Sequence, residues 1–208
     1  MASLVISYPI PPALQWWSNL GKGVEAYSSI MGYLVPGGKG PLDTDFQKAC
    51  GAFFQIRMPA EWRKEFYNLF NDYWKKKQQP DFETVLTALY NLTNGSATGC
   101  TRRTKKKYAL QCSFTSKMVH MLNPDCPIWD SKVMGKLSSF CGKYSTSWDD
   151  ETKLKQAPLV YKGLIDWYRV YLSTTNAEDV IEEFDKHFST YDAKITRTKK
   201  IDFMLWKL

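Results

Sequence analysis

The residues best suited to chemistry in this 208-residue chain lie between positions 102 and 133. This segment begins with a basic run, continues through a turn rich in serine and threonine, and ends in Pro-Ile-Trp-Asp ahead of a helix. Asp130 is expected at the N-terminus of that helix, where the helix dipole and free N–H groups favour an ionised carboxylate. A carboxylate held there could stabilise a developing positive charge or activate water. The alternative role is an ordinary helix cap, since aspartate is a preferred capping residue.

The charge balance points to a polyanionic partner. The chain has 28 Lys and Arg against 21 Asp and Glu, a formal net charge of +7, and much of the excess lies in the run 102–107. Such a surface attracts nucleic acid or anionic membrane. A basic face that is merely solvated is the alternative.

Several kinds of site find no support in the sequence. Five cysteines at irregular spacing, without a CxxC pair, predict reduced thiols instead of disulfides or zinc ligands, and with only two histidines no metal is expected. The glycine-rich stretch 36–41 lacks the GK[ST] ending of a phosphate-binding P-loop. No apolar run reaches the roughly 18 residues of a membrane span, and no secretion signal is evident, so a cytoplasmic protein with no membrane partner is expected.

Helical periodicity dominates the chain and predicts an all-α fold, because apolar residues recur every three or four positions. The one alternating, strand-like stretch is 4–8. Pro158 should kink or split its helix. The segment 159–172 is apolar almost all round and should be buried on most sides. Helices are expected at 44–56, 59–77, 81–94, 115–122, 130–140, from 147 onward, at 159–172, from Asn176, and at 199–206.

Residues 112–133 and the ending 199–206 resemble bacterial proteins with the 8-oxoguanine DNA glycosylase fold, a branch of the helix-hairpin-helix DNA glycosylase superfamily. The shared pattern is a Ser-Lys helix, an Asn-Pro break and Pro-Ile-aromatic-Asp-Ser, matched here at 116–117, 123–124 and 127–131. The close match covers about a tenth of the chain. The chain departs from the superfamily at 110–115, where the glycines of the usual Leu-Pro-Gly-Val-Gly hairpin are missing.

The resemblance implies a single glycosylase-like domain over 1–208, built as two packed helical lobes with a cleft between them. The first lobe would span 44–140 and contain the hairpin-like turn. The second would combine 1–43 with 141–208.

The resemblance further implies an enzyme without a cofactor that flips a modified base out of DNA and hydrolyses its N-glycosidic bond, leaving an abasic site. Asp130 takes the catalytic position. Lys117 lies about one residue from the position of a Schiff-base lysine, so it could add AP-lyase activity, or it could simply contact phosphate as a solvated lysine. Trp129 and His120 are assigned to the base pocket, with a packed histidine as the alternative for His120.

The partner implied is double-stranded DNA containing a modified base, bound by a monomer in a bacterial cytoplasm. The base could be a hypermodified phage pyrimidine such as glucosylated hydroxymethylcytosine, in antiphage defence, or an oxidised purine such as 8-oxoguanine, in repair. A non-catalytic helical DNA-binding protein and a helical interaction module are the alternatives. The residues assigned to DNA contacts are Arg102, Arg103, Lys105, Lys106, Lys107, Ser113, Thr115, Ser116, Ser131 and Lys132.

Overall fold

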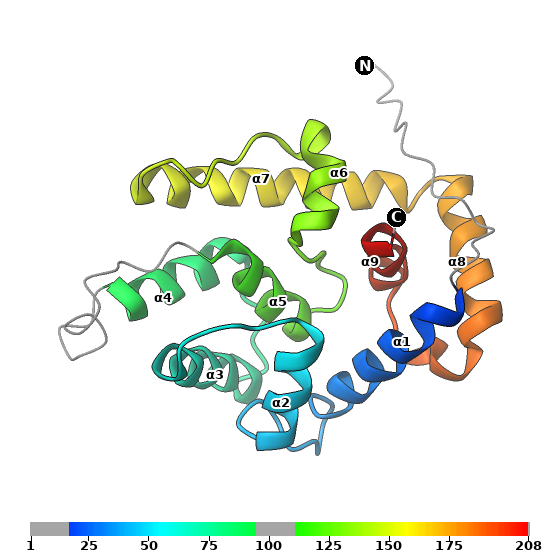
Figure 1. Cartoon of the computed structure of the whole chain (residues 1–208), viewed down its shortest axis with the longest axis horizontal. Helices are drawn as coiled ribbons and strands as arrows, with labels where there is room; N and C mark the ends of the chain where they lie inside the picture. Colours follow the sequence, from blue (N-terminus) through cyan, green and yellow to red (C-terminus); the bar gives the residue numbers. More distant parts are fainter. Residues whose placement is uncertain (1–16, 95–110, 208) are drawn as a thin grey trace.

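The computed structural model of the chain describes residues 17–94 and 111–207, and these are predominantly helical (Figure 1). The predicted all-α class is confirmed, since no strand occurs within these ranges. The strand signal at 4–8 lies outside the described residues. None of the helices in the described ranges is long and apolar enough to cross a membrane. The elements are α1 (Trp17–Gly32), α2 (Thr44–Phe53), α3 (Ala60–Lys75), α4 (Phe82–Asn94), α5 (Cys112–Leu122), α6 (Ser131–Cys141), α7 (Asp150–Tyr171), α8 (Thr175–Phe188), η1 (Ser189–Lys194) and α9 (Arg197–Lys207).

Helix α1 was not predicted from the sequence. Its buried residues Leu20, Val24, Tyr27 and Ile30 recur every three or four positions, so the amphipathic signal is present. Three glycines in the same helix lower its intrinsic helical propensity and mask that signal. Packing of α1 against α2 and α8 stabilises the helix in spite of the glycines.

Aspartate side chains cap several helices; the helix expected at 81–94 is capped by Asp81, whereas the one expected from 147 begins at Asp150 with Asp149 as its cap. Asp81 Oδ1 accepts a hydrogen bond from Thr84 N at 2.7 Å at the start of α4, and Asp149 Oδ1 accepts one from Thr152 N at 2.8 Å at the start of α7. Each such cap contributes about 1 kcal/mol to helix stability.

Helix α5 begins earlier than expected. The predicted start near Thr115, after a hairpin-like turn, is wrong: the helix begins at Cys112, and Thr115 N donates to Gln111 O within its first turn. The physical reason is burial, because Cys112 and Thr115 both lie in the interior, where α5 packs against α3 and α4. A helix satisfies these buried backbone groups, whereas a polar turn would leave them without partners.

Helix α7 runs without a break through Pro158, so the predicted split does not occur. Helix α7 packs against α4 and α6, and buried residues lie on both sides of the proline, among them Ala157 and Val160. The expectation that 159–172 is buried on most sides is also wrong. Leu159 is 60% exposed and Val170 is 42% exposed, so α7 has one buried face and one solvent face.

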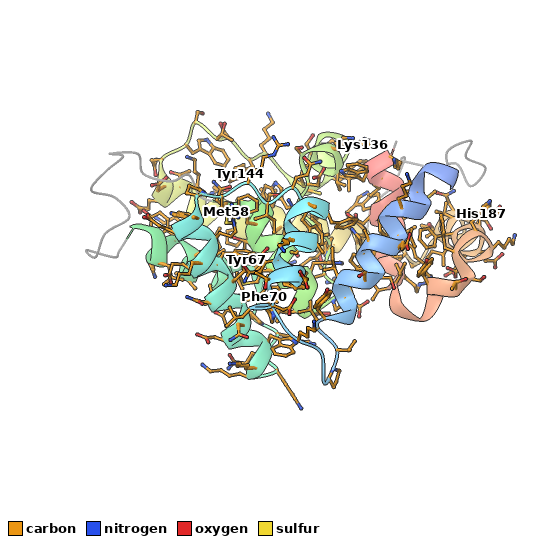
Figure 2. All side chains as sticks on the ribbon, turned by 60° about the horizontal axis from the view of Figure 1, so that its bottom comes forward. Met58, Tyr67, Phe70, Lys136, Tyr144 and His187 are labelled. Carbon is orange, nitrogen blue, oxygen red and sulfur yellow. The ribbon has the colours of Figure 1, made fainter. Side chains whose placement is uncertain are left out.

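The described helices share one aromatic-rich core. Tyr67 and Phe70 of α3, labelled in Figure 2, contact Phe46 of α2 with ring centroids 6.1 and 5.9 Å apart. Contacts link α4 to α7, α7 to α6, α6 to α9, α9 to α8 and α8 to α1. Helix α9 therefore lies inside the molecule (Figure 1), and residues 198–205 of α9 are all buried. Both predicted lobes contribute to this core; the division into lobes stays a prediction.

Candidate functional site

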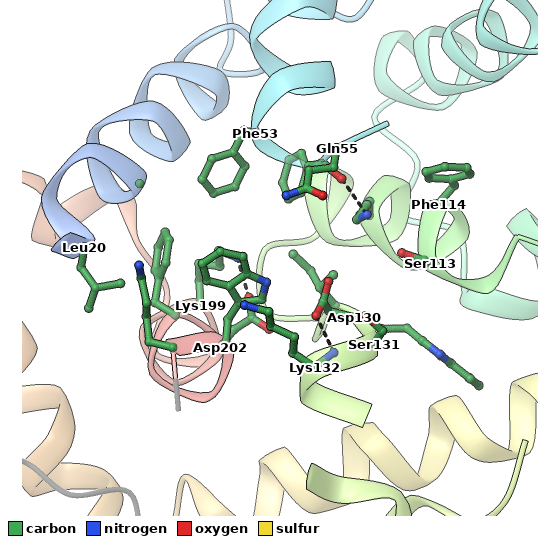
Figure 3. Close-up of a pocket in the computed structure, with 18 residues that line it drawn as sticks. Leu20, Phe53, Gln55, Ser113, Phe114, Asp130, Ser131, Lys132, Lys199 and Asp202 are labelled. Carbon is green, nitrogen blue, oxygen red and sulfur yellow. Dashed lines mark hydrogen bonds and ion pairs between the residues drawn. The ribbon is translucent and has the colours of Figure 1, made fainter. Parts of the chain in front are cut away.

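A pocket of about 710 Å³ opens between α1, the end of α2, α5, the start of α6 and α9 (Figure 3). Segments far apart in the sequence meet there, from both predicted lobes. Its wall combines aromatic rings with charged groups. The rings belong to Phe53, Phe54, Phe114, Trp129, Phe203 and Trp206, and the charged side chains are Lys117, Asp130, Lys132, Lys199, Asp202 and Lys207.

Asp130 lines this pocket as the N-cap of α6. Its backbone is extended, and its Oδ1 accepts a hydrogen bond from Lys132 N at 2.8 Å (Figure 3). The side chain is partly exposed, so the carboxylate is accessible from the pocket. The predicted cap is confirmed, and it orients one carboxylate oxygen while leaving the other for a ligand.

The segment before Asp130 is fixed by two buried hydrogen bonds. Trp129 N donates to Ser116 Oγ at 2.9 Å, and Tyr161 Oη donates to Pro127 O at 2.7 Å. These bonds tie the segment to α5 on one side and to α7 on the other. The backbone that leads to Asp130 is therefore held on both sides by buried contacts.

Lys117 lines the same pocket from α5 and is only 7% exposed. Its Nζ donates to Phe54 O at 2.8 Å and lies 5.4 Å from the centre of the Phe114 ring. Burial lowers the pKa of the Lys117 ammonium, and the negative charge of Asp130 opposes that shift without cancelling it. Within the described ranges no ion pair joins Lys117 to Asp130, and both side chains line the pocket.

The rim of the pocket is cationic. Lys132 at the start of α6 is exposed, and its Nζ lies 4.1 Å from the centre of the Trp206 ring. Lys207 Nζ lies 5.3 Å from the same ring. The first turn of α6 adds Ser131, with the positive end of the helix dipole beside it. The rim is suited to binding an anion such as a phosphate group.

Comparisons with protein-family models, with curated proteins and with solved structures found no match for this chain.

The structure brings some of the predicted site residues to the pocket and not others. Ser113, Ser131 and Lys132 line it together with Asp130 and Lys117. The basic run 102–107 lies outside the described residues. Thr115 and Ser116 are fully buried within α5, so neither can contact DNA. Their predicted role as phosphate ligands fails because the turn that would have exposed them is a helix.

Trp129 lines the pocket, so its assignment to a base pocket stays a prediction, whereas His120 does not line it. The Trp129 ring stacks on Phe82, 6.0 Å away at an interplanar angle of 11°, and meets Tyr144 edge-on, so it belongs to the core around α4. His120 is fully buried and does not line the pocket. Its Nε2 lies 2.9 Å from Tyr27 Oη and its Nδ1 lies 2.7 Å from Cys126 O. His120 is therefore a histidine packed in the core, which was the alternative to a place in the base pocket.

Sequence reasoning missed the α9 side of the pocket. Lys199 and Asp202 line it as a buried ion pair, and Phe203 adds an aromatic ring. The signal in the sequence was the presence of charged residues inside an otherwise apolar terminal segment. Across the described residues, no group of three or more His, Cys, Asp or Glu side chains could hold a metal ion.

Buried His120 should make the protein less stable in mild acid. Burial lowers its pKa to about 3, whereas a histidine in the unfolded chain takes up a proton below about pH 6.5. The unfolded state therefore binds the extra proton between these two values, and stability is lost as the pH falls. From pH 7 to pH 5 this effect should cost about 2 kcal/mol. The free energy of unfolding, measured with urea at pH 7 and at pH 5, checks this prediction, and the His120→Gln variant serves as the comparison. Equal pH dependence in the two proteins would contradict it.

Proposed function

We propose that this protein is a DNA glycosylase that removes a modified base from double-stranded DNA. The observation that carries the proposal is that Asp130, capping α6, and the buried amine of Lys117 line one pocket whose rim is cationic. An everted nucleotide needs an aromatic pocket for its base, a carboxylate near its sugar and positive charge near its phosphates. The pocket offers all three.

The chemistry assigned to these groups begins with cleavage of the N-glycosidic bond. The bond's electron pair leaves on the base, which takes up a proton, and positive charge develops on the sugar. Asp130 stabilises that charge, and water completes hydrolysis by adding to the sugar carbon and losing a proton. Alternatively the neutral amine of Lys117 adds to the same carbon and loses a proton. The bond from that carbon to the ring oxygen then breaks, the ring oxygen takes up a proton to become a hydroxyl group, and the nitrogen lone pair forms the imine. The lowered pKa of Lys117 favours this second, lyase-type route.

The size of the pocket bears on the substrate. A volume of about 710 Å³ lies in the upper part of the roughly 300–1,000 Å³ range that holds drug-sized ligands. The base, sugar and phosphate of an everted nucleotide would share this volume, so glucosylated hydroxymethylcytosine and 8-oxoguanine both stay candidate bases.

A substrate panel tests the proposed function. Duplexes that differ only in one modified base would be incubated with the protein and then treated with alkali, which breaks the strand at an abasic site. We expect a break at the modified position in one duplex and not in the unmodified control. The absence of a break in every duplex, in the presence of measurable DNA binding, would favour the non-catalytic DNA-binding alternative, in which Asp130 serves only as a helix cap.

The cationic rim should make DNA binding depend on salt. Removal of one cation that binds a DNA phosphate reduces the slope of log affinity against log salt concentration by about 1. Lys132→Met should therefore lower the slope by about 1. Lys186→Met is a matched control, because Lys186 is exposed on α8, pairs with Glu183 at 3.2 Å and does not line the pocket. Fluorescence anisotropy over a salt series measures both slopes, and equal slopes would remove Lys132 from the interface.

A further inference from the structure

A second charged pair lies on the α9 side of the pocket, surrounded by aromatic rings. Lys199 Nζ donates to Asp202 Oδ2 at 2.5 Å, and the two side chains are only 5% and 7% exposed. Both residues line the pocket, close to Phe53 and opposite Asp130 (Figure 3). Four rings lie 4.6–5.9 Å from the ammonium group, those of Tyr27, Phe53, Phe54 and Phe203.

The hydrogen-bonding capacity of this pair is only partly used. Lys199 Nζ carries three hydrogens, and among the described residues its one hydrogen-bond partner is Asp202. Asp202 Oδ1 accepts from Tyr168 Oη at 3.3 Å, which leaves lone pairs on both oxygens. Burying an ion pair costs desolvation energy, and apolar residues of similar size often replace one without loss of stability. A buried pair with unused donors and acceptors on a pocket wall therefore indicates a ligand.

The neighbouring lysine shows that pairing alone does not explain this arrangement. Lys200 Nζ also lies 2.5 Å from a carboxylate, that of Asp185, and its side chain is also 5% exposed. Lys200 does not line the pocket, whereas Lys199 does. The two lysine side chains are thus equally buried and each has a carboxylate partner, but only Lys199 lines the pocket.

The chemistry of the pair defines what it can bind. Because its charges cancel, it suits a neutral group that offers an acceptor beside a donor. The faces of Phe53 and Phe203 suit a flat ring. We infer that Lys199 and Asp202 recognise the edge of a heterocyclic base, with Nζ donating to a ring nitrogen or carbonyl oxygen and Asp202 accepting from an N–H. This inference rests on the proposed function, in which that heterocycle is the everted base.

The pocket would then hold each part of a nucleotide by different side chains. The Lys199–Asp202 pair reads the base, and Lys132 and Lys207, beside the Trp206 ring, bind the phosphates. Asp130 and Lys117 line the same pocket and would lie against the sugar of an everted nucleotide.

Binding of small probes to the full chain tests the inference without any need for catalysis. The probes are 8-oxo-2′-deoxyguanosine, 5-hydroxymethyl-2′-deoxycytidine and 2-deoxyribose 5-phosphate, which has no heterocycle. Dissociation constants come from chemical-shift changes in the ¹⁵N-labelled protein. Lys199→Met should weaken binding of at least one nucleoside about 10-fold or more and leave deoxyribose phosphate unaffected. Lys200→Met is the matched control and should bind like the unmodified protein.

A double variant distinguishes loss of the binding group from loss of folding. Lys199→Met alone leaves Asp202 buried without its partner, so Lys199→Met combined with Asp202→Leu removes both charges and keeps the net charge of the pocket. It should show the same loss of nucleoside binding. Equal binding by Lys199→Met and Lys200→Met, or no nucleoside binding by the unmodified protein, would overturn the inference. Nucleoside binding that depends on Lys199, together with an absence of base release from any DNA, would instead refute the proposed function and leave the base-reading site standing.

Discussion

Replacement of Asp130 by asparagine should slow base release at least about 100-fold and leave the fold and the affinity for DNA intact. Asparagine caps helices as well as aspartate does, so its Oδ1 can still accept from Lys132 N at the start of α6. What the variant loses is the negative charge that stabilises the sugar in the transition state. Single-turnover cleavage and DNA binding, measured on the same substrate, check the two parts of this result.

Asp130→Ala separates the capping role from the chemical one. Alanine removes both the cap and the charge, so this variant should lose about 1 kcal/mol of stability in addition to activity. If Asp130→Asn retained full activity and Asp130→Ala lost it, the role of Asp130 would be structural and the proposed chemistry would be wrong.

Replacement of Lys117 by methionine should abolish covalent trapping on DNA. Borohydride reduces an imine between a lysine and a sugar to a stable amine, so the unmodified protein should form a cross-linked complex that is visible on a denaturing gel. Methionine fills the space of the lysine stem and has no amine. Lys186→Met is the matched control, because it removes an exposed amine that does not line the pocket. Cross-linking that persists in Lys117→Met would assign the nucleophile to another amine.

The pH dependence of trapping should reflect the environment of Lys117. Only the neutral amine is a nucleophile, and burial lowers the pKa of Lys117 below the ordinary lysine value of about 10.4. The rate of trapping should therefore rise with pH and reach half its maximum below pH 10.4. Asp130 raises this pKa, so Asp130→Asn should shift the midpoint of any residual trapping to lower pH. A midpoint at or above the ordinary lysine value would show that Lys117 is not the titrating group.

The local part of the site could be predicted from the sequence. The position of Asp130 at the start of a helix follows from the Pro-Ile-Trp-Asp-Ser order, because proline and aspartate act on the backbone within a few residues. The helices with regular apolar spacing, such as α4, were predicted for the same reason. These features depend on neighbours in the chain and not on tertiary packing.

The parts that depend on tertiary contacts could not be predicted. The start of α5 follows from burial of Cys112 and Thr115 against other helices, and this burial turned the expected hydroxyl-rich turn into helix. The charged face of the pocket comes from α9, about 70 residues beyond Asp130 in the sequence. Lysine is normally a surface residue, so sequence reasoning does not place Lys199 inside a shell of aromatic rings.

Detection of the released base by mass spectrometry is the most direct test of the central claim. The protein would be incubated with a duplex that contains the modified base, and the small molecules would be separated from the DNA without alkali or nuclease. We expect free base in proportion to the modified sites with the unmodified protein, and at least about 100-fold less with Asp130→Asn. Recovery of every modified base still joined to its deoxyribose, after DNA binding has been verified, would contradict it.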